Sequence, residues 1–254
     1  MTSFFHDNQK DRGVVGHPGP VIRPTRRLFG FTLVELLVVI GVISLLMGIL
    51  LPALGAAKRQ AQSVYCLNNL RGIGVALKAY CLDYDDYLPQ TSHALDREKY
   101  WLRVLTRYTH ANIMFTCPAD KSEHPFVDWN LPQEDQPEEA RWSSYAVNVL
   151  FDVKNEFNNG RYNRLSSVRC PGKCIYVSEA PDSWITYDHV HPERWYYSLD
   201  LAKGQVAWDR HTNERSNYLF ADGAARTLAI EKTYSWPGDC LWFPGYAPNW
   251  PKDY

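Results

Sequence analysis

Histidine and carboxylate side chains that could serve as metal ligands lie in the last third of the chain. Asp188, His189 and His191 are close together in the sequence, and His211 and Asp222 follow further on. Imidazole nitrogens and carboxylate oxygens are ligands for zinc and related divalent ions. The spacing of these five residues matches no strong zinc motif, and no pattern in the sequence joins the two groups. We therefore expect no bound metal and no cofactor, with a metal site as the weaker alternative.

Cysteine thiols are the other reactive groups, and all six follow the longest apolar run of the chain. An even number of cysteines on one side of a membrane is typical of an oxidising compartment and of disulfides. Cys66 and Cys81 would lie roughly 22 Å apart on one helix, too far to bond each other. The sequence leaves the other pairings open, and several free buried thiols are the alternative. The candidates are Cys66, Cys81, Cys117, Cys170, Cys174 and Cys240.

Glu35 stands at the start of an apolar segment, where a carboxylate is costly and usually functional. No charged residue occurs in the 22 positions from Leu36 to Ala57. At about 1.5 Å per residue this run spans roughly 33 Å, enough for a hydrocarbon core of about 30 Å. Arg23, Arg26 and Arg27 precede it, and the positive-inside rule places that end in the cytoplasm. The sequence predicts one transmembrane helix, with the C-terminal body on the outer side.

A secretory signal peptide also combines a basic start with an apolar run. Its apolar region is about 7–15 residues long and ends at small residues that form a cleavage site. The run in this chain is longer and continues directly into sequence with a helical period. An anchor that stays attached is therefore the better interpretation.

The residues around Glu35 form the motif Gly30-Phe31-Thr32-Leu33-Val34-Glu35-Leu36-Leu37-Val38-Val39-Ile40. This motif resembles the signature of type IV prepilins and type II secretion pseudopilins. The resemblance implies cleavage after Gly30 by a prepilin peptidase, N-methylation of Phe31, and an assembly role for Glu35, the fifth residue of the mature chain. The resemblance also implies that this glutamate neutralises the new amine of a neighbouring subunit, which pairs two isolated charges in an apolar setting. Pro52 occupies a position where such helices often carry a kinking proline.

The resemblance implies a non-enzymatic subunit of a type IV pilus-like or type II secretion pseudopilus filament. Its expected partners are a prepilin peptidase and other pilin-like subunits, in a homo- or hetero-oligomeric filament. A single pass would hold the chain in the inner membrane, with a cytoplasmic leader and a periplasmic C-terminal domain, before assembly into a periplasmic or extracellular filament. The alternatives are a membrane-anchored periplasmic metal-dependent hydrolase and a carbohydrate-binding module that uses the many aromatic residues.

The composition fits an anchor followed by one globular domain. The chain has 254 residues, 45% of them hydrophobic and 14% aromatic, which is enough for a substantial core. The formal net charge is -1, but the first 30 residues hold five basic and two acidic side chains, so the remainder is mildly acidic. Nucleic-acid binding normally needs a clustered basic surface, and we exclude that class of function.

A long N-terminal helix is the first element that we predict. It should end before Leu88-Pro89, because a residue before proline avoids the α region. We predict a helix from about Phe31 to about Leu82. The chain would divide into a cleaved leader (1–30), the transmembrane half of the helix (31–55), its amphipathic half (56–88) and a periplasmic globular β-rich domain (89–254). The amphipathic half has an apolar stripe at the spacing of one helix face, formed by Cys66, Leu70, Ile73, Leu77 and Tyr80.

Short apolar and aromatic runs after Ser143 predict an antiparallel sheet. Asp222-Gly223 is a strong hairpin signal between the last two runs, because both residues tolerate positive φ. The fold class is therefore α+β: a long N-terminal transmembrane helix continues into a globular domain with an antiparallel sheet, the lollipop shape of pilins. The expected strands are Tyr145–Leu150, Cys174–Ser178, Trp195–Leu199, Tyr218–Ala221 and Ala225–Ile230.

Two further stretches resemble elements of a large pilin-like family of environmental bacteria. One is Cys66-Leu67-Asn68-Asn69-Leu70-Arg71 together with Phe115-Thr116-Cys117-Pro118. The other runs from His211 to Asp222-Gly223, with ten intervening residues where the family has nine. We interpret the second element as a hairpin that holds the fold, with a hydrogen-bonded histidine.

Overall fold

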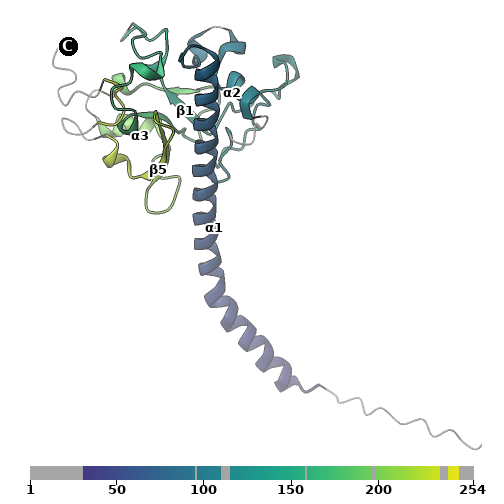
Figure 1. Ribbon diagram of the computed structural model, residues 1–254. Helices are drawn as coiled ribbons and strands as arrows, with labels where there is room; N and C mark the ends of the chain where they lie inside the picture. The colour runs from purple at the N-terminus through teal and green to yellow at the C-terminus, as the bar shows by residue number, and fades with distance from the viewer. Residues whose placement is uncertain are drawn as a thin grey trace, which may run out of the picture. The chain divides into compact units, whose positions relative to one another are not determined.

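The structure, a computed structural model, describes residues 31–94, 96–109, 115–157, 159–195, 198–234 and 240–245 (Figure 1). The chain divides into two compact units, residues 1–49 and residues 50–254. The predicted leader, including Gly30, lies outside the described residues. The helices are α1 (Leu33–Asp83), α2 (Trp101–Thr109) and α3 (Leu199–Gln205), and the strands are β1 (Tyr145–Asn148), β2 (Ile175–Glu179), β3 (His189–Val190), β4 (Ser216–Phe220) and β5 (Ala225–Leu228).

The described part of the N-terminal unit is the beginning of α1. Residues 31–49 are all exposed, although 14 of these 19 residues are hydrophobic. α1 is long and apolar enough to cross a membrane, and a helix satisfies its backbone hydrogen bonds internally, as lipid requires. Exposed apolar surface of this extent marks contact with a membrane or a partner. The predicted long N-terminal helix is therefore confirmed, and it fits a single-pass membrane anchor.

In the globular unit, the later turns of α1 pack into the core. Cys66, Leu70, Ile73 and Leu77 are buried, as their helical spacing predicted, and Tyr80 packs half-buried against them. Figure 1 shows these turns of α1 passing beside the sheet of the same unit. Burial of this stripe, rather than intrinsic helix propensity, is the main source of stability for this part of the helix.

Gly74 lies on the packed face of α1, where glycine would ordinarily cost about 1 kcal/mol relative to alanine. A Cβ atom at this position would lie 2.9 Å from Leu219 Cδ1 and 3.3 Å from the carbonyl oxygen of Gly223. The missing side chain therefore lets the helix backbone approach the turn between β4 and β5.

The globular unit is built on a five-stranded sheet in the order β3-β1-β2-β4-β5. Successive side chains of a strand point to opposite faces. Accordingly, Tyr145 and Leu219 enter a core shared with α1 and α2, whereas Ala146 and Tyr218 enter a second core that contains Trp195. Because both faces are covered, the central strands are buried throughout instead of alternating between buried and exposed residues.

The predicted hairpin at Asp222-Gly223 is confirmed. β4 and β5 pair antiparallel from Ser216 opposite Leu228 to Leu219 opposite Ala225. Gly223 has a φ of 86°, a value that side chains strongly disfavour. The Asp222 carboxylate accepts a hydrogen bond from the N–H of Ala224 at 2.8 Å and so closes the turn.

The predicted α+β class is confirmed, but two details of the predicted sheet are wrong. The sheet is mixed rather than antiparallel, because the two-residue strand β3 pairs parallel with β1 and was too short to recognise from sequence. The predicted strand Trp195–Leu199 is wrong at both described ends. Trp195 follows a 3₁₀ turn, Pro192–Arg194, and Leu199 begins α3, which is capped by Ser198. We did not predict α2 from the sequence; its amphipathic turns bury Trp101 and Leu105.

Candidate functional site

The N-terminal motif begins α1 with a capping box. The Thr32 N–H and Oγ1 donate to Glu35 Oε2 at 2.9 and 2.8 Å, and the Glu35 N–H donates to Thr32 Oγ1 at 3.2 Å. This reciprocal pairing satisfies N–H groups that a helix otherwise leaves free at its start. Phe31 is 72% exposed. Pro52 lies inside α1, and the predicted kink at that residue stays a prediction.

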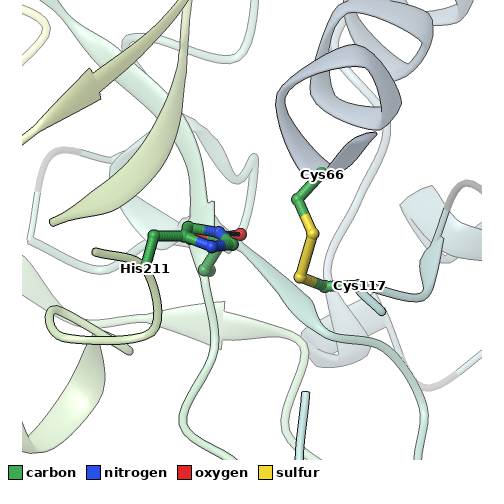
Figure 2. A group of neighbouring side chains, drawn as sticks. Cys66, Cys117 and His211 are labelled. Carbon is green, nitrogen blue, oxygen red and sulfur yellow. Dashed lines mark hydrogen bonds and ion pairs between the residues drawn. A yellow bond between two sulfur atoms is a disulfide. The ribbon is translucent and has the colours of Figure 1, made fainter. Parts of the chain in front are cut away.

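Only one pair of the six cysteines forms a disulfide in the described structure. Cys66 on α1 is bonded to Cys117, which lies between α2 and β1 (Figure 2). Asn69, one turn along the helix, donates to the carbonyl oxygen of Thr116 at 2.8 Å and fixes the same segment. The remaining cysteines are free thiols: Cys81, Cys170, Cys174 and Cys240.

His211 is buried beside this disulfide (Figure 2). Its Nε2 atom lies 2.8 Å from Glu179 Oε1, and its Nδ1 atom has no hydrogen-bond partner among the described residues. The two sulfurs, a Glu179 oxygen and a His211 nitrogen all lie within 4.8 Å of one another. Because the sulfurs are joined to each other, they are not available as thiolate ligands for a metal.

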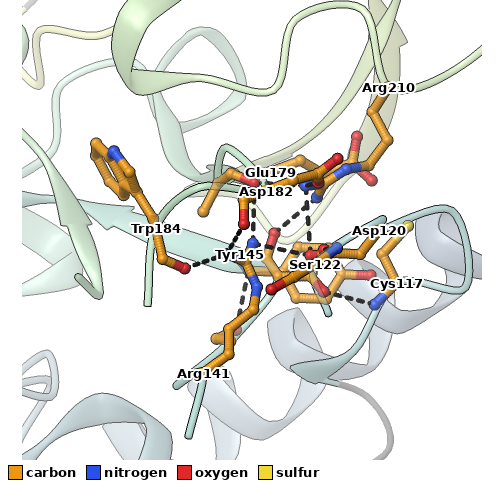
Figure 3. A network of polar contacts seen from close by, with 12 residues as sticks. Cys117, Asp120, Ser122, Arg141, Tyr145, Glu179, Asp182, Trp184 and Arg210 are labelled. Atoms are coloured by element: carbon orange, nitrogen blue, oxygen red, sulfur yellow. Dashed lines mark hydrogen bonds and ion pairs between the residues drawn. The ribbon is translucent and has the colours of Figure 1, made fainter. Parts of the chain in front are cut away.

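Two buried arginines form a charged network next to Glu179 (Figure 3). Arg141 Nη2 and Arg210 Nη2 lie 2.8 and 3.4 Å from Asp120 Oδ2, and Arg210 also pairs with Asp182. Burial opposes the charged form of Arg210, but Glu179, Asp120 and Asp182 together raise its pKa, so the guanidinium stays charged. Both guanidinium groups also donate to backbone carbonyls. The network therefore joins the segment that precedes β1, the segment that follows β2 and the segment that precedes β4, and its role is structural.

Three imidazole rings converge at one edge of the sheet. His189 Nε2 and His191 Nε2 are 3.1 Å apart, and the ring centroids of His93 and His189 are 4.4 Å apart. One nitrogen from each of the three rings lies within 4.8 Å of the other two. Burial and the neighbouring His189 lower the pKa of His93, which favours the neutral ring.

Carboxylates fix the second nitrogen of two of these rings. His189 Nδ1 lies 2.7 Å from Asp188 Oδ1, and His191 Nδ1 lies 2.7 Å from Glu193 Oε1. A carboxylate oxygen is a hydrogen-bond acceptor, so this geometry selects the tautomer in which each Nδ1 atom is the donor. In that tautomer each Nε2 atom presents a lone pair.

The same carboxylate brings distant segments of the chain together. Asp188 also accepts hydrogen bonds from the N–H and Oγ of Ser92, at 3.0 and 2.8 Å, and so holds the 3₁₀ turn that carries His93. His189 belongs to β3 and is positioned by its pairing with β1. The N–H of His191 donates to Gln205 Oε1, on α3, at 2.7 Å. The three rings are thus held by Asp188, by the pairing of β3 with β1, and by Gln205 of α3.

The three rings line a pocket of about 350 Å³. Trp184, Tyr187 and Arg194 also line it. His189 is buried, whereas His93 and His191 are half-buried. The converging nitrogens are therefore supported from behind by the fold and accessible from the pocket.

The structure brings together only some of the metal-ligand candidates that the sequence offered. His189 and His191 lie side by side with Asp188 behind them, whereas His211 contacts Glu179 and Asp222 lies in the hairpin turn. His93 was missed, because its approach depends on tertiary contacts between distant segments. The sequence signal for the other two rings was the His-x-His spacing of His189 and His191, of which only His189 lies in β3.

Comparison with known proteins identifies the N-terminal region. The prokaryotic N-terminal methylation motif matches residues 26–51. No curated protein and no solved structure matches the chain. The match covers Gly30, Phe31 and Glu35, and it coincides with the exposed apolar start of α1. The chain therefore carries a prepilin-type leader, the feature that marks type IV pilin-like and pseudopilin-like subunits.

Proposed function

We propose that the chain is a non-enzymatic subunit of a type IV pilus-like or type II secretion pseudopilus filament. The observation that carries the proposal is the methylation motif over residues 26–51. A prepilin peptidase would cut after Gly30, and Phe31 would become the methylated N-terminus. The beginning of α1 would hold the chain in the inner membrane and later pack against other pilin-like subunits, while the globular unit occupies the periplasm.

Glu35 has two roles to separate in this proposal. Its carboxylate completes the capping box with Thr32 within the same chain. Assembly would use its charge, because the amine freed by cleavage needs an opposite charge once it enters an apolar environment. A glutamine at this position retains the capping box but lacks the charge.

Processing is tested with Gly30→Ala in the full chain expressed in its native membrane. The variant should stay about 30 residues longer than the processed form, because the peptidase needs an accessible backbone before the scissile bond. Gly19→Ala, a second leader glycine, serves as the matched control and should be cut normally. Mass spectrometry of the N-terminus measures both, and a normally cut Gly30→Ala chain would contradict the proposed cleavage site.

Assembly is tested with Glu35→Gln and Thr32→Ala. If the charge of Glu35 pairs with a neighbouring amine, Glu35→Gln is processed but absent from sheared filaments. Thr32→Ala weakens the cap yet keeps the charge, so it should still enter filaments. Equal incorporation of Glu35→Gln and the unmodified chain, measured by immunoblotting of the filament fraction, would show that Glu35 acts only as a cap.

A further inference from the structure

We propose that His93, His189 and His191 bind a zinc ion at the edge of the sheet in the globular unit. This site is not implied by the methylation motif, and it replaces the sequence-based expectation of no bound metal. It lies wholly within residues 50–254, so it stands or falls independently of the proposed filament function.

The contacts around the rings leave their Nε2 atoms available to a cation. Asp188 and Glu193 lie against the Nδ1 atoms of His189 and His191, and the two Nε2 atoms face each other at 3.1 Å. When each Nδ1 donates to its carboxylate, the two Nε2 lone pairs point at one another, which is repulsive. A metal ion that accepts both lone pairs removes this repulsion.

The spacing fits tetrahedral zinc. With Zn–N bonds of about 2.0–2.1 Å, two nitrogen ligands of a tetrahedral ion lie about 3.3 Å apart. The observed separation of the His189 and His191 Nε2 atoms is 3.1 Å. His93 supplies the third nitrogen, within 4.8 Å of the other two, so a small movement of its half-buried ring completes the set.

The surroundings are those of a metal site. Metal-binding histidines usually donate their other ring N–H to a carboxylate, which fixes the tautomer and raises the basicity of the ligand. Asp188 and Glu193 both do so, and Asp188 is fully buried and held in place by Ser92. Two such pairs at one point are more than a hydrogen-bonded core histidine requires.

Ligand type and number define the ion and its open position. Imidazole ligands favour zinc and similar transition metals over magnesium and calcium, which prefer oxygen. Three protein ligands leave one position of a tetrahedral zinc free, as in sites that hold water or a small ligand. Since the three rings line the pocket beside Trp184 and Tyr187, that position faces the pocket and takes water.

A proton shared between His189 and His191 is the rival explanation of the short contact. It would hold these two rings together as a histidine–histidinium pair. The shared-proton explanation does not involve His93, and it predicts that the chain has no affinity for zinc.

The experiment uses the full chain in detergent, stripped of metal with a chelator and titrated with Zn²⁺ in a calorimeter. The unmodified chain should bind one zinc ion, with Ca²⁺ as a probe that does not compete. Glu193→Ala should bind about 10–100-fold more weakly, because it loses only an orienting partner. His93→Ala and His189→Ala should lose more zinc affinity than Glu193→Ala. His124→Ala, outside the cluster, should bind zinc as the unmodified chain does.

Folding of each variant is checked by circular dichroism and by the intact Cys66–Cys117 disulfide. Of the two substituted ligands, half-buried His93 should disturb the fold less than buried His189. Absence of zinc binding by the unmodified chain would overturn the proposal in favour of the shared proton. Unchanged binding in folded His93→Ala, or an equal loss in His124→Ala, would also overturn it, because the zinc would then lie elsewhere.

Discussion

Loss of the Cys66–Cys117 disulfide should destabilise the globular unit by about 4 kcal/mol. The bond joins residues separated by 51 positions. By the chain-entropy relation, a loop of this length restricts the unfolded chain by about 14 cal/mol/K, or about 4 kcal/mol at 25 °C. The hydrogen bond from Asn69 to Thr116 still holds α1 against the same segment in the folded state. The loss therefore arises chiefly from the greater freedom of the unfolded chain.

The double variant Cys66→Ala/Cys117→Ala tests this magnitude. For a domain of about 200 residues, each kcal/mol shifts Tm by about 2–4 °C, so we expect a fall of about 8–16 °C. Thermal unfolding of the full chain in detergent, followed by near-ultraviolet circular dichroism, measures it. Cys170→Ala removes a half-buried free thiol and is the control, expected within about 2 °C of the unmodified chain. A double variant equally close to the unmodified chain would refute the reasoning.

Three further perturbations test other parts of the fold. Burial and then Asp86 raise the pKa of Cys81 to about 12, and burial raises that of Cys240 to about 12. Both thiols therefore stay protonated at about pH 8. Iodoacetamide should label half-buried Cys170 before either of them. Rapid labelling of Cys81 in the folded chain would contradict this prediction. Arg141→Ala should cost about 3 kcal/mol in denaturant unfolding, the lower end for a broken buried pair, because Asp120 loses its closest partner and retains only Arg210 at 3.4 Å. A loss under about 1 kcal/mol would place that pair among the weak surface pairs. Gly223→Ala should cost about 1 kcal/mol, because alanine is strained at its φ of 86°, whereas Gly204→Ala on α3, with open space around it, should not destabilise the fold.

The features that were predicted correctly from the sequence each depend on residues that lie close together in the chain. The apolar run after Glu35 and the period from Cys66 to Leu77 gave the helix and its buried face, because a helix repeats every 3.6 residues whatever it packs against. Asp222-Gly223 gave the hairpin, because the turn needs only two residues that tolerate positive φ. The motif around Gly30 was likewise local, and the methylation motif matches it.

Tertiary structure alone decided which distant groups meet. The pairing of Cys66 with Cys117, one of 15 connectivities for six cysteines, follows from the packing of α1 against the segment before β1. The histidine cluster needs β3 beside β1 and the turn of His93 held by Asp188, contacts that leave no periodic trace in the sequence. The sequence by itself therefore determined the anchor, the helix and the hairpin, because local backbone preferences fix them. The disulfide and the proposed zinc site exist only because packing brings remote segments to one place.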